Sequence, residues 1–178
     1  PDSKLKRSGS HKSNQNAKYQ LDSIVSYNYK YEFTYNEAGA IDLWEYFLWN
    51  AQDGQWAEQE KKVWTYDEYG NKITYETYSW DDYNSQWIND NKKITSHESN
   101  GDSTTESYWW DTITSQWIGW YKSISSYDST GNRTLNMGYN WVEGQWLRKN
   151  RIIYNYDENG NIISEWYYTW SIIENQWL

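Results

Sequence analysis

From Ile24 onward, large apolar side chains recur at every second position, and polar residues lie between them. The first such series is Tyr27, Tyr29, Tyr31, Phe33 and Tyr35. A period of two is typical of β-strands, which also favour aromatic residues. No helical period competes with this pattern. We therefore predict ten strands, with the bounds 24–35, 40–49, 56–66, 71–80, 87–97, 102–110, 117–127, 132–141, 146–156 and 161–170.

Short polar segments that end in glycine separate alternate pairs of these strands. The glycines are Gly39, Gly70, Gly101, Gly131 and Gly160, and four of the five segments begin with Asp or Asn. This pattern predicts a type I turn followed by a glycine with positive φ, with the acid side chain capping the turn. We expect that role for Asp67, Asp128 and Asp157. A calcium site is the alternative, but the dense oxygen ligands of an EF-hand loop are missing.

The turns belong to a longer repeat. The landmark glycines are 31, 31, 30 and 29 residues apart, and five Gln-Trp pairs keep a similar spacing at 55–56, 86–87, 116–117, 145–146 and 176–177. The repeat units are about 31–62, 63–93, 94–123, 124–151 and 152–178. A second tryptophan precedes each Gln-Trp pair, so we expect two indoles to clamp the base of each longer loop.

These elements predict an all-β fold, an up-and-down antiparallel meander of about ten strands from five units. Aromatic residues on both faces need covering, so we expect a coiled or closed sheet, with a single-layer sheet as the alternative. Residues 1–20 are polar, basic and without periodicity, which predicts a tail or linker before an array over 21–178. Strand edges at both ends of the array predict edge-to-edge contact with further repeats.

Two further expectations concern side chains within the strands. Strict alternation places Trp56 and Val63 on opposite faces, and likewise Trp117 and Ile124. A base lies nine residues before each landmark glycine, at Lys30, Lys61, Lys92, Lys122 and Arg151. Pairing across the short turns would place the first two bases opposite Glu45 and Glu76, in a ladder that sets the register. A binding stripe is the alternative interpretation of the five bases.

Three of the turns carry a motif with a known counterpart. Tyr66-Asp67-x-x-Gly70-Asn71, Tyr127-Asp128-x-x-Gly131-Asn132 and Tyr156-Asp157-x-x-Gly160-Asn161 resemble the YD motif of RHS/YD-repeat proteins. With the added Gln-Trp half, the chain is similar to tandem repeats of secreted or surface proteins of Bacteroidetes over about 31–178. The first and third units depart from the motif, at Tyr35-Asn36 and His97-Glu98. The resemblance implies an exported β-sheet array, located outside the cell or on its surface.

Composition narrows the classes of partner. The net charge is −9, which argues against nucleic acid and anionic membranes, because both attract basic surfaces. No apolar run is long enough for a membrane span, so we expect no membrane insertion. The chain has no Cys and only two histidines, His11 in the tail and His97 at a position where other units have Tyr. We expect His97 to fill the tyrosine's packing position, and we assign no catalytic residue, metal or cofactor.

The aromatic residues are the remaining candidates, with 15 Trp and 19 Tyr in 178 residues. Those at fixed positions of the repeat are expected to be architectural. Tryptophans off the pattern are better candidates for stacking on a sugar ring: Trp44, Trp64, Trp109, Trp120 and Trp166. The leading hypothesis is a non-enzymatic structural, adhesive or protein-interaction domain. The alternatives are a carbohydrate-binding module and, third, a glycan-active enzyme with two carboxylates in a cleft.

Overall fold

The computed structural model describes residues 20–178 and places them in one antiparallel β-meander. The tail assigned to residues 1–20 therefore lies almost wholly outside the described residues. The strands follow one another in sequence order, and the described residues form no helix. Their bounds are β1 Ser23–Val25, β2 Tyr29–Tyr35, β3 Ile41–Asn50, β4 Gln55–Tyr66, β5 Lys72–Asp81, β6 Gln86–His97, β7 Ser103–Asp111, β8 Gln116–Tyr127, β9 Arg133–Val142, β10 Gln145–Tyr156, β11 Ile162–Ser171 and β12 Gln176–Trp177.

The predicted all-β meander is confirmed, and nine of the ten predicted strands begin and end within one residue of observed ones. The predicted strand 24–35 is wrong, because it folds back on itself as β1 and β2. Tyr27 lies at the tip of this turn and is 96% exposed, although it continues the alternating series. The polar neighbours Ser26 and Asn28 allow the turn, and β1 then pairs with the outer side of β2.

The sheet is the single layer that we considered as the alternative, and it does not close. No described side chain is less than 2% exposed, and only Phe47 and Tyr154 among the large apolar side chains are buried. The expectation of a closed sheet was wrong because the long side chains cover one another across neighbouring strands. Trp, Tyr, Lys and Glu have apolar stems or rings that can be half covered while their polar ends reach water.

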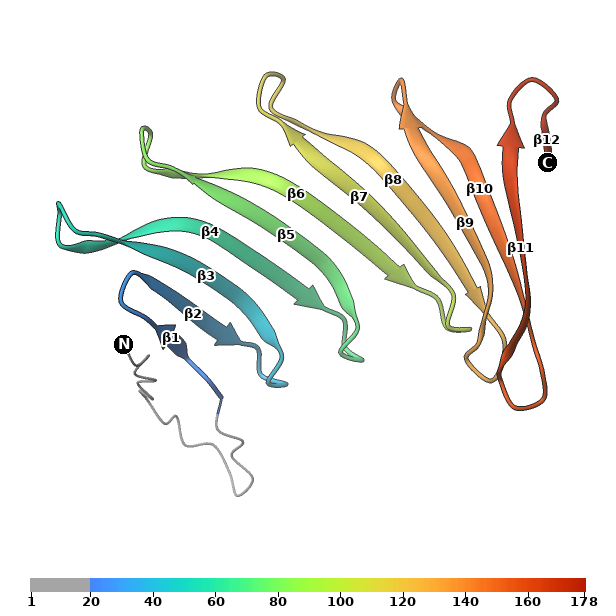
Figure 1. Cartoon of the computed structure of the whole chain (residues 1–178), viewed down its shortest axis with the longest axis horizontal. Helices are drawn as coiled ribbons and strands as arrows, with labels where there is room; N and C mark the ends of the chain where they lie inside the picture. Colours follow the sequence, from blue (N-terminus) through green and yellow to red (C-terminus); the bar gives the residue numbers. More distant parts are fainter. Residues whose placement is uncertain (1–19) are drawn as a thin grey trace. The chain divides into compact units, whose positions relative to one another are not determined.

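The described residues divide into two compact units. Unit 1 comprises residues 20–70 and Tyr75–Asp90, and unit 2 comprises Asn71–Thr74 and Asn91–Leu178. Within each unit, consecutive strands run in opposite directions and are joined by hairpin turns (Figure 1). Each unit is described separately below.

The short turns have the predicted geometry. All five landmark glycines have positive φ, between 80° and 90°. Asp128 and Asp157 cap their turns as expected, each with one carboxylate oxygen that accepts two backbone N–H bonds of 2.8–2.9 Å. Asp67 accepts such a bond from the N–H of Tyr69. The turn at Glu98 is different, because Asn100 accepts the N–H of Asp102 instead.

The longer loops are closed by tryptophan pairs, as predicted. Each pair is T-shaped, with ring centroids 4.8–5.2 Å apart. The residue before each Gln-Trp pair has positive φ, and it is glycine in only two of the five loops. The pairs are Trp49–Trp56, Trp80–Trp87, Trp110–Trp117, Trp141–Trp146 and Trp170–Trp177.

A bulge shortly after the tryptophan shifts the faces of the long strands. The register skips Gln59 in β4, Trp120 in β8 and Lys149 in β10. Beyond the bulge, residues of opposite parity take over each face. Trp56 and Val63 therefore share a face, as do Trp117 and Ile124, which contradicts the prediction from strict alternation.

Candidate functional site

The bases at fixed positions lie over aromatic rings of the following hairpin. In unit 1, the Lys30 ammonium is 3.9 Å from the centroid of the Phe47 ring and 5.9 Å from that of Trp56. The Lys61 ammonium is 4.6 Å from both the Tyr78 and the Trp87 rings. An ammonium at these distances is attracted to the negative face of a ring. We call the face of unit 1 that carries Lys30, Glu45 and Lys61 its ladder face.

The same arrangement recurs in unit 2. Arg151 lies over Tyr168 and Trp177, at 4.5 and 4.9 Å, and Lys92 lies 5.7 Å from the Trp117 ring. The register joins these groups on one face, through Glu106 opposite Lys122, Lys122 opposite Tyr139, and Arg151 opposite Tyr168. This is the ladder face of unit 2. Its cations are held by rings and carboxylates of the chain itself, which supports the register-setting interpretation over a binding stripe.

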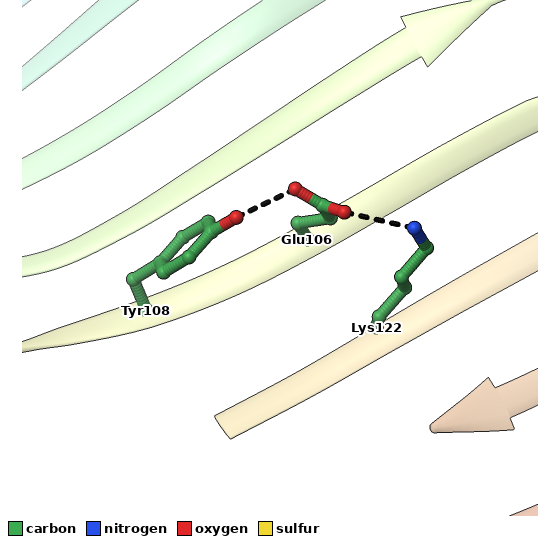
Figure 2. Close-up of polar contacts among 3 residues, drawn as sticks. All are labelled: Glu106, Tyr108 and Lys122. Carbon is green, nitrogen blue, oxygen red and sulfur yellow. Dashed lines mark hydrogen bonds and ion pairs between the residues drawn. The ribbon is translucent and has the colours of Figure 1, made fainter. Parts of the chain in front are cut away.

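Glu106 is the most extensively bonded carboxylate of this ladder. It lies between Tyr108, whose hydroxyl donates to one carboxylate oxygen at 2.5 Å, and Lys122, whose ammonium donates to the other at 2.9 Å (Figure 2). Partial burial acts to raise the pKa of Glu106, but the bonds from Tyr108 and Lys122 outweigh it and the pKa is lowered. Burial and the bond to Glu106 together raise the pKa of Tyr108 to about 12.

The prediction that Lys30 lies opposite Glu45 was wrong. Lys30 lies opposite Phe47, and Glu45 lies opposite Lys61 across the next loop. Tyr35 pairs with Ile41 across the short turn, and a bulge between Thr34 and Tyr35 shifts the pairing by one further residue, so Lys30 lies opposite Phe47 and not Glu45. Lys30 instead bonds Glu32 on its own strand, at 2.9 Å. Burial raises the pKa of Glu45, while the charge of Lys61 acts to lower it.

The five off-pattern tryptophans do not form one site. In unit 1, Trp44 and Trp64 share the face opposite the ladder. In unit 2, Trp109 lies opposite the ladder face, Trp166 lies on it, and Trp120 lies at the bulge of β8. Trp109, Trp120 and Trp166 are 44%, 56% and 57% exposed. The bulge residue Trp120 could not be assigned to a face by alternation, because the sequence gives no sign of the extra residue.

Trp44 belongs to a stack of rings rather than to an open platform. Its ring lies 5.5 Å from Tyr31 and 6.2 Å from Tyr46, at interplanar angles of 24° and 18°. The Lys62 ammonium lies 4.2 Å from the Trp44 ring centroid. Trp64 lies 5.5 Å from Tyr75. Rings that stand face to face present their edges outward, whereas a sugar stacks on an open ring face, so these contacts favour a packing role for Trp44.

His97 takes the position of the tyrosines, as expected. In unit 1, the Tyr66 hydroxyl donates to the carbonyl of Ile41 at 2.6 Å. In unit 2, the Tyr156 hydroxyl donates to the carbonyl of Arg133, and His97 Nε2 lies 3.4 Å from the carbonyl of Lys72. All three side chains thus reach the backbone at the start of the preceding returning strand. Residues 1–19, including His11, are not described.

An open hollow of about 600 Å³ lies in unit 2 between two neighbouring short turns. Asp128 and Asp157 line it, together with Asn132 and Glu158. Bonds from Thr130 lower the pKa of Asp128, and bonds from Asn161 lower that of Asp157, so both carboxylates serve their own turns. Across residues 20–178, no three His, Cys, Asp or Glu side chains are grouped so that they could hold a metal ion.

The chain was compared with known families and structures. No protein-family model matches it, and no curated protein matches it. Within residues 20–178 there is no helix that could cross a membrane. Several solved structures are similar, and three of them, at 18–22% sequence identity, are described next.

The first is a protein of unknown function from Bacteroides fragilis NCTC 9343, at a TM-score of 0.56 and 18% identity over 70% of this chain and 91% of that one. The second is a DUF3836 family protein from Bacteroides vulgatus ATCC 8482, with a TM-score of 0.43 and 18% identity over 52% of this chain and 90% of that one. The third is a DUF3836 family protein from Parabacteroides distasonis ATCC 8503, with a TM-score of 0.39 and 22% identity over 50% of this chain and 80% of that one. At 18% identity, the first comparison shows similarity of fold alone, to a protein whose function is unknown.

Proposed function

We propose that this chain is a non-enzymatic, exported repeat domain with a structural or adhesive role, acting through contacts with other proteins. One observation carries this proposal. The charged and aromatic side chains at fixed positions of the repeat are engaged with one another, as in Lys61 over Tyr78 and Trp87 and in Glu106 between Tyr108 and Lys122. Such side chains hold neighbouring strands in register, and the faces and edges of the strands remain as the surface for partners.

The resemblance of the Tyr-Asp-x-x-Gly-Asn turns to YD-repeat proteins supports a location outside the cell or on its surface. The capped turns built by Asp128 and Asp157 show what this motif does locally. The motif closes a hairpin through hydrogen bonds inside the turn itself, so many copies can be joined in tandem. This supports a structural role for the array.

A carbohydrate-binding module is the second candidate. It is favoured by the exposure of Trp109, Trp120 and Trp166, which are 44–57% exposed. The dispersal of the candidate tryptophans argues against one shared sugar platform, because Trp109 and Trp166 lie on opposite faces of unit 2.

A glycan-array screen of the whole chain, with parallel titrations of tryptophan fluorescence, separates the two candidates. The proposal expects no saturable glycan binding and no turnover of the arrayed glycans. Saturable binding that disappears in Trp109→Ala, Trp120→Ala or Trp166→Ala, with the fold intact, would establish the binding-module function instead. Hydrolysis of a glycan would establish the third alternative, an enzyme.

A further inference from the structure

One position of the ladder in unit 2 lacks its carboxylate. Glu106 lies opposite Lys122 (Figure 2), but Met137 takes the corresponding place opposite Arg151. A tyrosine hydroxyl donates to Glu106 at 2.5 Å, whereas the equivalent hydroxyl of Tyr139 has only the sulfur of Met137, at 3.8 Å. A thioether is a weak acceptor. The base and the hydroxyl that hold a carboxylate elsewhere in the ladder are thus both present here without one.

The guanidinium of Arg151 is held by rings alone. It lies 4.5 Å from the Tyr168 ring and 4.9 Å from the Trp177 ring. Among residues 20–178, no hydrogen bond or ion pair joins it to another side chain, and its Nε is buried without a partner. Stacking occupies the faces of a guanidinium and leaves the N–H groups at its edge free to donate. Arg151 is therefore oriented in advance for an acceptor that the chain itself does not supply.

A second arginine lies beside it on the ladder face. Arg148 is exposed, and its guanidinium lies 4.7 Å from the Trp170 ring. No carboxylate in the described part of the chain forms an ion pair with it. The register places the two arginines opposite Tyr139 and Met137. These two residues are neighbours on one face of β9, so the arginines lie about 7 Å apart along the strand. We call Arg148 and Arg151 the arginine pair.

The arginine pair specifies the chemistry of a ligand. Each guanidinium offers a planar fork of N–H donors that matches a carboxylate. In an extended peptide, side chains at alternate positions point to the same side and are about 7 Å apart, which is the spacing of the pair. The net charge of −9 repels long polyanions, but at physiological ionic strength charges are screened beyond about 8 Å. A short acidic segment therefore suits the pair better than nucleic acid or an anionic membrane.

We propose that the arginine pair binds an extended acidic segment of a partner protein, with Asp or Glu at alternate positions. One carboxylate takes the place beside Arg151 and the Tyr139 hydroxyl that Glu106 takes beside Lys122, and the next carboxylate contacts Arg148. This proposal rests on the proposed function, since it names the contact through which a protein-interaction domain would act.

The probe is the acetylated peptide Gly-Glu-Gly-Glu-Gly, titrated into the whole chain by isothermal calorimetry. We expect saturable binding of this peptide and none of its glutamine analogue, Gly-Gln-Gly-Gln-Gly. Arg151→Met should weaken binding about tenfold or more, because it removes charge-assisted hydrogen bonds. Arg133→Met is the matched control, since it removes the same charge from an arginine that lies 4.8 Å from the Tyr154 ring. It should leave the affinity within about twofold, because that charge is distant and screened.

A second pair of variants fills the vacant carboxylate position from within the chain. Met137→Glu restores the arrangement of Glu106 and Lys122, so the chain should fold and its affinity for the peptide should fall about tenfold or more. Met137→Gln has a similar size without the charge, and it should bind the peptide as the wild-type chain does. This comparison tests the proposal even if Arg151→Met fails to fold.

Several results would overturn the proposal. The first is an absence of saturable binding to the wild-type chain, or equal binding by Met137→Glu and Met137→Gln. Acetate or inorganic phosphate that binds as tightly as the peptide would replace the acidic segment with a small anion. Self-association of the wild-type chain that Met137→Glu abolishes would replace it with a second copy. In each of these cases a silent glycan array would still support the proposed function, which fails only if glycans bind or are cleaved.

Discussion

Replacing Lys61 with methionine tests whether the cations over the rings stabilise the sheet. Methionine keeps the length and the apolar stem but removes the charge that lies 4.6 Å from both the Tyr78 and the Trp87 rings. Each half-exposed cation–π contact is worth about 0.5–1 kcal/mol, so the two together contribute about 1–2 kcal/mol. Loss of attraction to Glu45 adds at most about 1 kcal/mol, because both groups are partly in water.

The assay is urea unfolding followed by tryptophan fluorescence. With a denaturant slope of about 2 kcal/mol per M, a loss of 1.5 kcal/mol, the middle of that estimate, lowers the midpoint by about 0.8 M. Lys61→Arg keeps a cation over the rings, so its loss in free energy of unfolding should be less than half that of Lys61→Met. Lys93 is exposed, so Lys93→Met is the matched control, with an expected change within about 0.5 kcal/mol. Equal losses in Lys61→Met and Lys93→Met, or in Lys61→Met and Lys61→Arg, would refute the reasoning.

The pH dependence of the same variant gives a second readout. Burial already raises the pKa of Glu45 in the folded chain, and Lys61 acts to lower it. Without Lys61 that pKa rises further, so the folded state holds a proton that the unfolded state has released. Stability then falls as pH rises through the raised pKa. The difference in free energy of unfolding between the wild-type chain and Lys61→Met should therefore narrow as pH falls from neutral toward the pH range in which carboxyl groups titrate. A difference that widens would contradict this account.

Three further predictions follow from the turns, the tyrosines and a close contact. Ser115 has a φ of 54°, so Ser115→Gly should stabilise the chain by about 0.5–1 kcal/mol in urea unfolding, while Ser115→Ala should not. Tyr78 and Tyr108 have pKa values raised to about 12, so in a spectroscopic pH titration their phenolate absorbance should appear above the pH at which ordinary tyrosines ionise. The free energy of unfolding should fall as pH rises from about 10 toward 12. Replacing either tyrosine with Phe should remove one of the two high-pH steps from the titration. A Cβ on Gly119 would lie 2.7 Å from the Trp141 ring, so Gly119→Ala should destabilise by about 1–3 kcal/mol, measured by thermal unfolding.

The sequence was sufficient for the strands and turns because their patterns are local. The period of two identified the strands, and Asp128 with Gly131 identified a turn whose chemistry lies within five residues. The tryptophan clamp was also predictable, because its two residues flank one loop. These features depend on neighbours along the chain.

Face and register were not predictable, because each depends on a single inserted residue. The bulges at Gln59 and Trp120 look like ordinary strand positions in the sequence, yet they reverse the faces of all the residues that follow. The predicted pairing of Lys30 was off by two residues, one from the turn, where Tyr35 pairs with Ile41, and one from the bulge between Thr34 and Tyr35. The closed sheet was expected because exposed aromatic residues seemed to require covering, whereas rings such as Trp44 are covered by Tyr31 and Lys62 within one layer.

The candidate site was predictable only as a list of residues. Their position off the repeat pattern identified Trp109 and Trp166, and both are exposed. Their separation onto opposite faces follows from the register through β8, β9 and β10, which the sequence does not encode locally.

The central claim is that the tryptophan pairs at fixed positions hold the sheet together, whereas the exposed off-pattern Trp109 contributes less. Trp109 and Trp110 test it most directly, because they are adjacent in β7 and face opposite sides. Trp110 packs against Trp117 at 5.2 Å, whereas Trp109 is 44% exposed. Urea unfolding should show that Trp110→Ala loses at least about 1 kcal/mol more than Trp109→Ala, since an aromatic pair adds about 0.5–1.5 kcal/mol beyond burial. Equal losses, or a larger loss at Trp109, would contradict the account.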